Sequence, residues 1–140
     1  MFKHADVTEA IVRTFLTVYN TLGYGFAEKI YHGSMLIELR RNGLSVCSEQ
    51  PISVQYRGTV VGEFFADIVV NDCVVIELKA VRELIDEHRA QLLNYLKSSR
   101  NEVGMLLNFG KEPQYERKAY ENKSKGGLTW TSDKGVNTLR

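Results

Sequence analysis

The sequence contains few of the residues that mark several large classes of protein. Its 140 residues include only two cysteines, Cys47 and Cys73, which form no CxxC pair. Two separate cysteines in strand-like segments predict buried, reduced thiols, and therefore the cytoplasm. No apolar run approaches the ~20 residues that span a membrane, and residues 1–10 lack the apolar stretch of a secretory signal. We therefore expect a cytoplasmic protein with no membrane partner.

An excess of charge of one sign is also missing. Lysine and arginine number 18, and aspartate and glutamate number 17, which gives a formal net charge of +1. This balance disfavours a protein that coats nucleic acid, although it leaves room for a local basic groove. With 44% hydrophobic and 25% charged residues, the chain has the composition and length of one globular domain.

Helical periodicity marks three segments. The first begins at Asp6, which with Glu9 resembles a capping box, and glycines at positions 23 and 25 end it. Its apolar stripe consists of Val7, Ile11, Phe15, Val18 and Leu22. The second helix is expected from about 26 to 41, before a C-terminal glycine at position 43. Its expected core contacts are Phe26, Ile30, Met35 and Ile37. The third helix is expected over 86–99.

Strands account for most of the remaining chain. Residues 45–56 alternate in polarity and are interrupted at Pro51. Tight turns at 57–58 and 71–72 would join this strand to two others in an antiparallel meander. The expected strands are 45–56, 60–70, 73–80, the continuously apolar and therefore central 103–109, and 114–120. The order ααβββαββ predicts an α/β (α+β) fold with helices flanking a central mixed sheet.

The composition changes after about residue 120. Residues 1–120 are expected to form one domain. Residues 121–140 are polar and rich in glycine, with Leu128 and Trp130 as the candidate anchors. We expect this segment to be a loosely attached C-terminal tail.

Three charged residues in adjacent apolar strands are the main functional signal. Glu77 and Lys79 are two residues apart, so in a strand they project from the same face. Asp67 lies near the end of the preceding strand-like run. Charges among apolar residues are costly unless they are paired or bind a metal. The alternatives are an exposed edge strand with a cross-strand salt bridge, and an aspartate that belongs to a turn.

Converging carboxylates predict a metal site. Asp67 and Glu77 would repel each other and raise each other's pKa. A hard cation such as Mg²⁺ or Mn²⁺ removes this penalty, and it could polarise a phosphoryl oxygen and activate water. Lys79 would then orient that water or stabilise the transition state.

Two helical faces supply further candidates. His88, Gln91 and Tyr95 lie at i, i+3 and i+7, on one face of the third expected helix. Gln91 could hold water or a phosphate oxygen, and Tyr95 could contact a phosphate or a base. A solvated face is the alternative reading of this triplet.

The second expected helix offers an additional acid. Glu28, Tyr31 and His32 share a face at i, i+3 and i+4. Glu28 could reach the site as a further metal ligand. A solvent-facing Glu–His pair is the alternative.

These residues together resemble a known family. Gly25-Phe-Ala-Glu28-Lys-Ile-Tyr31 matches the signature of the GxxExxY proteins. These are small bacterial and archaeal proteins placed in the PD-(D/E)XK nuclease superfamily. The resemblance covers roughly residues 5–120 and includes, in order, Asp67, Glu77-Leu-Lys79, Gln91-Leu-Leu-Asn-Tyr95-Leu and Gly104-Met-Leu-Leu-Asn-Phe-Gly110. Ala66-Asp67 stands where the superfamily name has proline-aspartate.

The resemblance implies a restriction-endonuclease-like core and assigns roles to the candidates. Glu28, Asp67 and Glu77 would be the metal ligands, and Lys79 the catalytic lysine. Gln91 and Tyr95 resemble the Q-x-x-x-Y element of the exonuclease-like branch. Candidate catalytic residues are thus Asp67, Glu77, Lys79, Gln91 and Tyr95, and candidate substrate contacts are Tyr31 and His88.

Two main hypotheses follow. The first is a Mg²⁺-dependent (or Mn²⁺-dependent) nuclease that cleaves DNA, in preference to RNA, and that could act as a homodimer. The second is a nuclease fold with little or no catalysis that binds nucleic acid or a protein. A third is a toxin-like or defence-associated nuclease with a partner. A basic rim around the Asp67–Glu77 edge would favour the nuclease, and its candidates are Lys29, Arg82, Arg89, Lys97 and Arg100.

Overall fold

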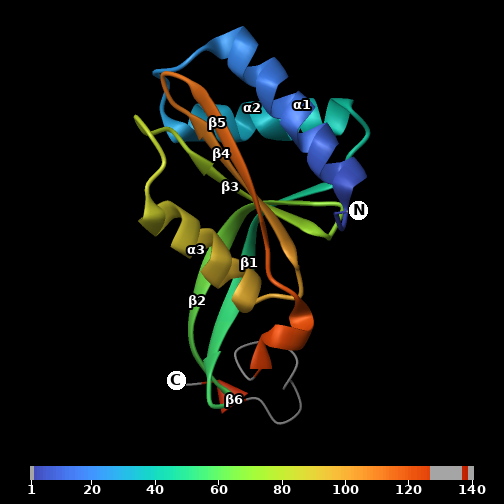
Figure 1. Ribbon diagram of the computed structural model, residues 1–140, viewed down its shortest axis with the longest axis vertical. Coiled ribbons are helices and arrows are strands. Elements are labelled where there is room, and N and C mark those ends of the chain that lie inside the picture. The colour runs from blue at the N-terminus through green and yellow to red at the C-terminus, as the bar shows by residue number, and fades with distance from the viewer. Residues whose placement is uncertain (1, 127–136, 139–140) are drawn as a thin grey trace.

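The structure is a computed structural model that describes residues 2–126 and 137–138 (Figure 1). The helices are α1 (Ala5–Leu22), α2 (Glu28–Arg41), α3 (Asp86–Lys97) and a 3₁₀ turn, η1 (Asn122–Ser124). The strands are β1 (Val46–Tyr56), β2 (Thr59–Val70), β3 (Val74–Lys79), β4 (Val103–Phe109), β5 (Pro113–Ala119) and the short β6 (Asn137–Thr138). The order of the elements up to β5 confirms the predicted ααβββαββ arrangement.

One mixed sheet organises the molecule, with the strand order β1-β2-β3-β4-β5 and with β6 paired to β2. β1, β2 and β3 form the antiparallel meander that the two turn signals predicted. β3 and β4 are parallel because the chain crosses over through α3 between them. β4 is buried along its whole length between β3 and β5, which confirms its predicted central position.

The helices cover opposite faces of this sheet. α1 and α2 pack with Ile76, Leu78 and Phe109 in one core, whereas α3 packs with Val75 and Leu106 in a second core. Side chains alternate along a strand, so Glu77 and Lys79 lie on the α3 side of β3, with Val75. The described helices include none that is long and apolar enough to cross a bilayer.

The start of α1 differs from the prediction. The residue that precedes the helix is His4, whose side chain makes no capping hydrogen bond, and Asp6 lies within the first turn. The expected capping box at Asp6 and Glu9 is therefore wrong. Asp6 can still stabilise the helix, because an acidic side chain in the first turn opposes the positive end of the helix dipole.

The apolar contacts of α2 also differ from those expected. Phe26, Ile30 and Ile37 are exposed, and the buried residues are Tyr31, Met35 and Leu39. These three residues are four positions apart, so they form one stripe that faces the sheet. Phe26, Ile30 and Ile37 lie outside this stripe. The predicted glycine terminus is correct. Gly43 has φ +81°, its N–H donates to Arg40 O at 3.0 Å and Leu44 N–H donates to Leu39 O at 3.1 Å, as in a Schellman motif.

The edge position of β1 explains two further differences. β1 continues through Pro51, which pairs with Phe65, instead of being interrupted there. An edge strand tolerates proline because the missing N–H can face away from the sheet. Cys47, expected to be buried, is exposed on the same strand, whereas Cys73 is partly buried, and both thiols are free.

The segment after β5 is held at its beginning. Lys125 is buried, and its ammonium group donates to Ser99 O and Asn101 O, both at 2.8 Å. Leu128 and Trp130, the candidate anchors of the tail, lie outside the described residues. The division at residue 120 therefore stays a prediction.

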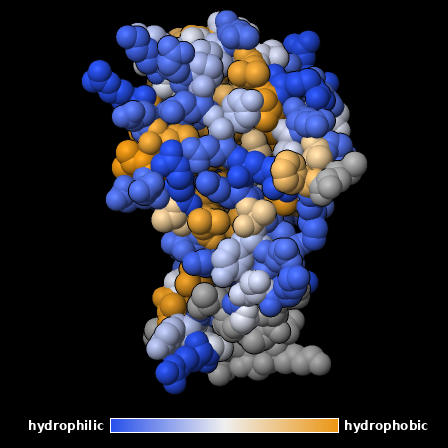
Figure 2. All heavy atoms as spheres, in the orientation of Figure 1, coloured by the Kyte–Doolittle hydropathy of each residue, from blue (hydrophilic) through white to orange (hydrophobic). Residues whose placement is uncertain are grey.

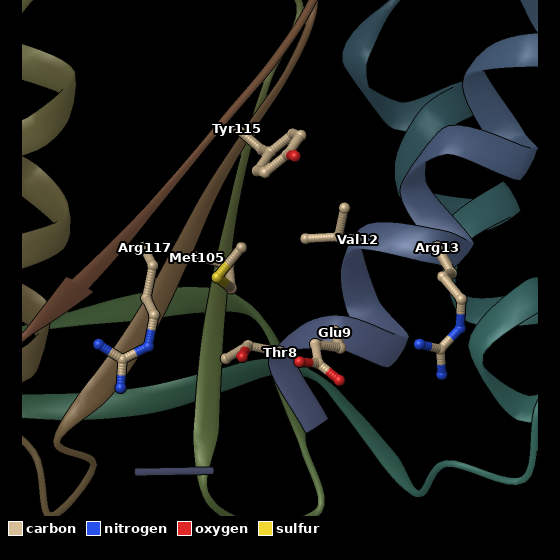
Figure 3. Close-up of a pocket in the computed structure, with 7 residues that line it drawn as sticks. All are labelled: Thr8, Glu9, Val12, Arg13, Met105, Tyr115 and Arg117. Atoms are coloured by element: carbon tan, nitrogen blue, oxygen red, sulfur yellow. The ribbon is translucent and has the colours of Figure 1, made fainter. Parts of the chain in front are cut away.

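A hollow of about 440 Å³ lies between α1 and the strands β4 and β5 (Figure 3). Its lining residues are Thr8, Glu9, Val12, Arg13, Met105, Tyr115 and Arg117. Figure 2 shows that one whole side of the molecule is mostly hydrophilic, with hydrophobic atoms in separate patches. The hollow is on the face opposite Glu77, and no predicted site residue lines it.

Candidate active site

Asp67 and Glu77 are brought together where the pairing of β2 with β3 stops. The register ends at Ile68 and Ile76, so the next facing residues are Asp67 and Glu77. There the backbone N–H of Leu78 donates to Asp67 Oδ2 at 2.8 Å instead of to a strand carbonyl. The Asp67 side chain therefore ends the ladder, and it is fixed beside the Glu77 carboxylate.

Glu77 is the most strongly perturbed acid of this group. The residue is only 4% exposed, and its Oε2 is buried without a hydrogen-bond partner in the described structure. Burial and then the negative charge of Asp67 raise its pKa to about 9, although Lys79 opposes the shift. Lys79 Nζ lies 3.8 Å from Glu77 Oε1. Glu77 thus holds a proton at neutral pH unless a cation compensates its charge.

A chain of hydrogen bonds connects Lys79 to α3. Lys79 Nζ donates to Gln91 Oε1 at 3.0 Å, and Gln91 Nε2 donates to the Tyr95 hydroxyl at 2.7 Å. The Tyr95 ring stacks on Phe64 of β2, with 4.2 Å between centroids. Burial, followed by the charges of Glu77 and Asp67, raises the pKa of Tyr95 to about 12. Tyr95 is therefore a neutral hydroxyl that keeps its own proton for donation.

α2 supplies two groups that lie near Asp67, namely Glu28 and His32. Burial, followed by the charge of Asp67, raises the pKa of Glu28, whereas Lys79 and His32 lower it. Glu28 therefore belongs to the same electrostatic cluster, although it lies at the surface. His32 Nε2 is 3.1 Å from the backbone oxygen of Asp67 and 3.1 Å from Ser48 Oγ. A carbonyl only accepts, so we assign the proton to Nε2.

The donor set suits a divalent cation. Carboxylates are the preferred ligands of Mg²⁺ and Mn²⁺, and the unpartnered Oε2 of Glu77 is a buried acceptor that such an ion would satisfy. In the described ranges, no three His, Cys, Asp or Glu side chains are arranged as a ready-made metal site. Asp67 and Glu77 are thus a preformed pair, and Glu28 would have to approach them.

Two expected substrate contacts have other surroundings. The Tyr31 ring is fully buried and stacks on Phe109 at 4.1 Å. Its hydroxyl donates to Gly23 O at 2.7 Å and accepts from Phe26 N–H at 3.2 Å. In this structure Tyr31 fixes the α1–α2 loop, and its contact with substrate stays a prediction. His88 Nδ1 accepts from Ile85 N–H at 3.1 Å, so it closes the first turn of α3 instead of joining Gln91 and Tyr95.

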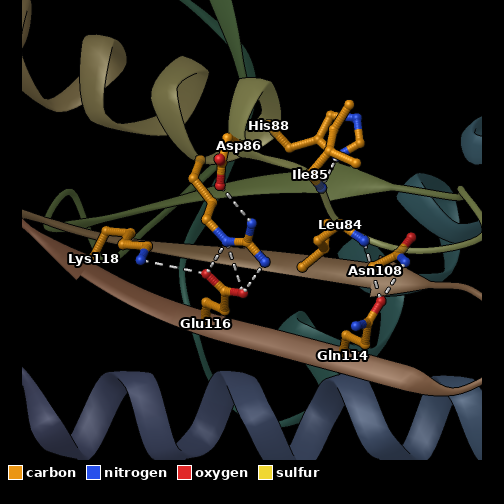
Figure 4. A network of polar contacts seen from close by, with 9 residues as sticks. Leu84, Ile85, Asp86, His88, Asn108, Gln114, Glu116 and Lys118 are labelled. Atoms are coloured by element: carbon orange, nitrogen blue, oxygen red, sulfur yellow. Dashed lines mark hydrogen bonds and ion pairs between the residues drawn. The ribbon is translucent and has the colours of Figure 1, made fainter.

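Two of the five candidate rim cations are engaged elsewhere. Arg89 binds Glu116 of β5 with N–O distances of 2.8–3.0 Å and Asp86 at 3.1 Å, in the network of Figure 4. Lys97 Nζ lies 5.5 Å from the centre of the Tyr120 ring. These contacts attach α3 to β5 and to Tyr120. They leave fewer free cations for the basic rim that the sequence suggested.

Asn108 is a positioning residue that the sequence interpretation missed. It is fully buried in β4. Its Oδ1 accepts from Val81 N–H and its Nδ2 donates to Val81 O, both at 3.0 Å. Nδ2 also donates to Gln114 Oε1 at 3.1 Å (Figure 4). Asn108 thus clamps the backbone two residues after Lys79. The available signal was a single amide within the otherwise apolar run of β4.

A groove adjoins the site on the α3 side. It has a volume of about 560 Å³ and lies between α3 and the β1–β2 hairpin. Its lining residues are Val54, Phe64, Glu87, Ala90, Gln91, Asn94, Tyr95, Lys97 and Ser98. Because Gln91 and Tyr95 form part of its wall, this groove is an open approach to the Lys79 side of the site.

Comparison with known proteins agrees with this architecture. The crystal structure of SSO0001 superimposes with a TM-score of 0.50 and 19% sequence identity, over 66% of this chain and 50% of that chain. This chain therefore spans about half the length of SSO0001, and the likeness concerns the fold alone. No curated protein matches the sequence. The model of the PD-(D/E)XK nuclease superfamily matches residues 5–119. The chain, with its mixed sheet and its Asp67, Glu77 and Lys79 at the end of the β2–β3 pairing, belongs to the PD-(D/E)XK nuclease superfamily.

Proposed function

We propose that this protein is a Mg²⁺- or Mn²⁺-dependent nuclease of the GxxExxY group that hydrolyses phosphodiester bonds in DNA, in preference to RNA. The observation that carries the proposal is the Glu77 carboxyl group, buried beside Asp67 with one oxygen unpartnered. A buried acid next to a second acid destabilises a fold, so such a pair is more typical of a functional site than of a structural one. A divalent cation offsets the repulsion and supplies the chemistry that the superfamily fold suggests.

The proposed roles follow from the donor set. Asp67, Glu77 and Glu28 would hold the ion, which when bound supplies Lewis-acid chemistry toward a phosphoryl oxygen and water. Lys79 uses one N–H for Gln91, so its other donors are free to stabilise negative charge on the reacting phosphate. Gln91 keeps Lys79 in place, and Tyr95, which stacks on Phe64, in turn accepts a hydrogen bond from Gln91.

The proposal is tested by calorimetric titration of Mg²⁺ and Mn²⁺ into the intact protein and into Glu77→Ala, followed by cleavage assays with mixed single- and double-stranded DNA. We expect the variant to lose both metal binding and metal-dependent cleavage. Glu9→Ala is the matched control, because Glu9 is an exposed acid on the opposite face. Unchanged metal affinity in Glu77→Ala would remove the site from the mechanism.

The second candidate function is a binding module without catalysis. The engagement of Arg89 and Lys97 in other contacts favours it, because fewer cations remain for phosphate. Failure of the intact protein to bind either metal would point to this function. We further propose that the protein acts in the cytoplasm, in agreement with its two free thiols.

A homodimer is proposed for cleavage of both strands of a duplex, because each chain carries one Asp67–Glu77 pair. Sedimentation of the protein with a non-cleaved duplex in EDTA checks this. A strictly monomeric complex, from an enzyme that cuts both strands together, would contradict the dimer.

A further inference from the structure

A second hollow, of about 340 Å³, adjoins the candidate active site at the ends of three loops. It is lined by Tyr24, Gly25, Phe26, Ala80, Val81, Arg82, Phe109, Gly110 and Lys111. Figure 1 shows the α1–α2 loop, the end of β3 and the β4–β5 turn converging at the upper left. Phe26 precedes Glu28 by two residues and Ala80 follows Lys79. The hollow is therefore built by residues that neighbour Glu28 and Lys79 in the chain.

Two glycines are required to build this hollow. Gly25 has φ +109°, which side chains rarely adopt. A Cβ at Gly110 would lie 2.5 Å from the Val81 carbonyl oxygen. Gly25 thus allows the backbone turn of the loop before α2, and Gly110 allows the loop after β4 to approach the segment after β3 closely.

The aromatic wall of the hollow is exposed yet held in place. Tyr24 is 59% exposed and Phe26 is 48% exposed. The Phe26 ring meets Tyr31 edge to face, with 6.1 Å between centroids, and Tyr31 stacks on Phe109. The Tyr31 hydroxyl also accepts the N–H of Phe26. Buried aromatic residues thus hold the exposed Phe26 ring in place.

The charge of the hollow has one sign. Arg82 and Lys111 are its charged lining residues, and no carboxylate lines it. Among the described residues, neither side chain has a hydrogen bond or an ion pair. Asn108 fixes Val81 on both its N–H and its C=O, which positions the backbone of Arg82. A nucleotide has a base, which can stack on the exposed rings, and a phosphate, which the two unengaged cations can contact.

We propose that this hollow binds a single-stranded segment of the DNA substrate, with a base stacked on Tyr24 and Phe26 and the adjacent phosphates contacted by Arg82 and Lys111. The proposal rests on the proposed nuclease function and defines its substrate class. Within a strand, the faces of paired bases are covered by their stacked neighbours, whereas unpaired bases can stack on aromatic side chains. Frayed ends, flaps and single strands are therefore the expected substrates.

The test measures binding without metal, so that cleavage does not intervene. A fluorescein-labelled thymidine 12-mer and a blunt hairpin duplex are titrated by anisotropy in EDTA. We expect the intact protein to bind the single strand about tenfold or more tightly than the duplex. Phe26→Ala and Tyr24→Ala should each weaken single-strand binding about tenfold. Tyr115→Ala is the matched control, because Tyr115 is 49% exposed and lines the hollow between α1 and β5 instead of this one.

A second pair of variants keeps the test informative if the aromatic variants misfold. Arg82→Ser and Lys111→Ser lie on surface loops, and each should reduce the slope of log affinity against log salt by about 0.7. Lys123→Ser, an exposed lysine paired with Glu121, should leave the slope unchanged. Equal affinity for duplex and single strand, or equal loss in Tyr115→Ala, would overturn the proposal.

Cleavage with Mn²⁺ then separates this proposal from the proposed function. Single-strand binding that depends on Phe26, without cleavage by the intact protein, would contradict the nuclease and retain the hollow as a binding site. Cleavage by the intact protein with no loss of binding in Phe26→Ala or Arg82→Ser would retain the nuclease and reject the hollow.

Discussion

Glu77 links the stability of this protein to its chemistry at the level of a single carboxyl group. The same burial that prepares the residue to hold a cation makes its ionised form unfavourable when no cation is bound. Asp67 adds to this effect, whereas Lys79 at 3.8 Å compensates only part of it. We therefore expect the ionised Glu77 carboxylate to destabilise the metal-free protein, and a bound cation to remove this destabilisation.

The stability of the metal-free protein should fall as the pH rises from about 4.5 to about 9. The folded-state pKa of Glu77, about 9, lies above its ordinary value of 4.5, so in this interval the folded state binds more protons than the unfolded state. Glu77→Gln should abolish the fall and stabilise the protein at pH 8 by about 2 kcal/mol or more, since one pKa unit corresponds to about 1.4 kcal/mol. Urea unfolding in EDTA at pH 5 and pH 8 measures this. Parallel pH profiles for the two proteins would show that folding does not raise the pKa of Glu77.

Lys79→Ala should separate metal binding from catalysis. Its ammonium group donates to Gln91 rather than serving as a metal ligand, so calorimetry should show an affinity for Mn²⁺ within a few-fold of the original. Cleavage should fall by about 10²–10³-fold, the usual loss when one donor to a transition-state oxyanion is removed. Full cleavage by this variant would remove the lysine from the mechanism.

At the level of helices and strands, the sequence predicted the elements because their periodicities are strong and uninterrupted. β4 was located from its apolar run, and the Gly43 terminus from the residue that a left-handed backbone requires. The burial of α2 could not be predicted in the same way. Apolar residues surround this helix, and only the position of the sheet decides that Met35 is buried while Ile37 is exposed.

The arrangement of the candidate site could be predicted where it depends on spacing along the chain, and not where it depends on tertiary hydrogen bonds. The i, i+2 spacing of Glu77 and Lys79 places both on one face, and the structure brings Gln91 and Tyr95 to that face. The hydrogen bonds of Tyr31 within its loop had no sequence signal, because they join a side chain to backbone groups whose positions depend on Gly25. The pairing of Asn108 with Val81 depends equally on the tertiary fold.

Asn108→Leu tests whether β4 positions the segment that follows β3. The leucine has a similar size but leaves the N–H and C=O of Val81 without the partner that now satisfies both. Such a loss should destabilise the protein by about 2–3 kcal/mol, measured as a lower urea midpoint with an unchanged slope. Asn94→Ala, at an exposed position of α3, is the control. A midpoint equal to that of the original protein would show that Asn108 does not stabilise this segment.

At the level of the whole molecule, charge is local rather than global. A net charge of +1 gives little long-range attraction for nucleic acid. Several basic side chains are neutralised within the fold, as Arg89 is by Glu116 and Lys3 by Glu102. Under the proposed function, affinity for DNA would therefore come from the few cations around the active site and the adjacent hollow. Specificity for particular DNA structures should then depend more on shape and stacking than on total charge.

This distribution of charge predicts a shallow salt dependence. A bound single strand can contact Lys79, Arg82, Lys111 and at most one further cation, so about three or four phosphates would be neutralised. Since each phosphate contributes about −0.7 for single strands, the slope of log affinity against log salt should lie between about −2 and −3. Anisotropy titrations of a thymidine 12-mer between 50 and 300 mM salt, roughly the range in which counterion release dominates, measure it. A slope steeper than about −5 would require an extended basic surface, and the described structure, in which Arg89 and Lys97 are already engaged, offers no place for one beside Asp67 and Glu77.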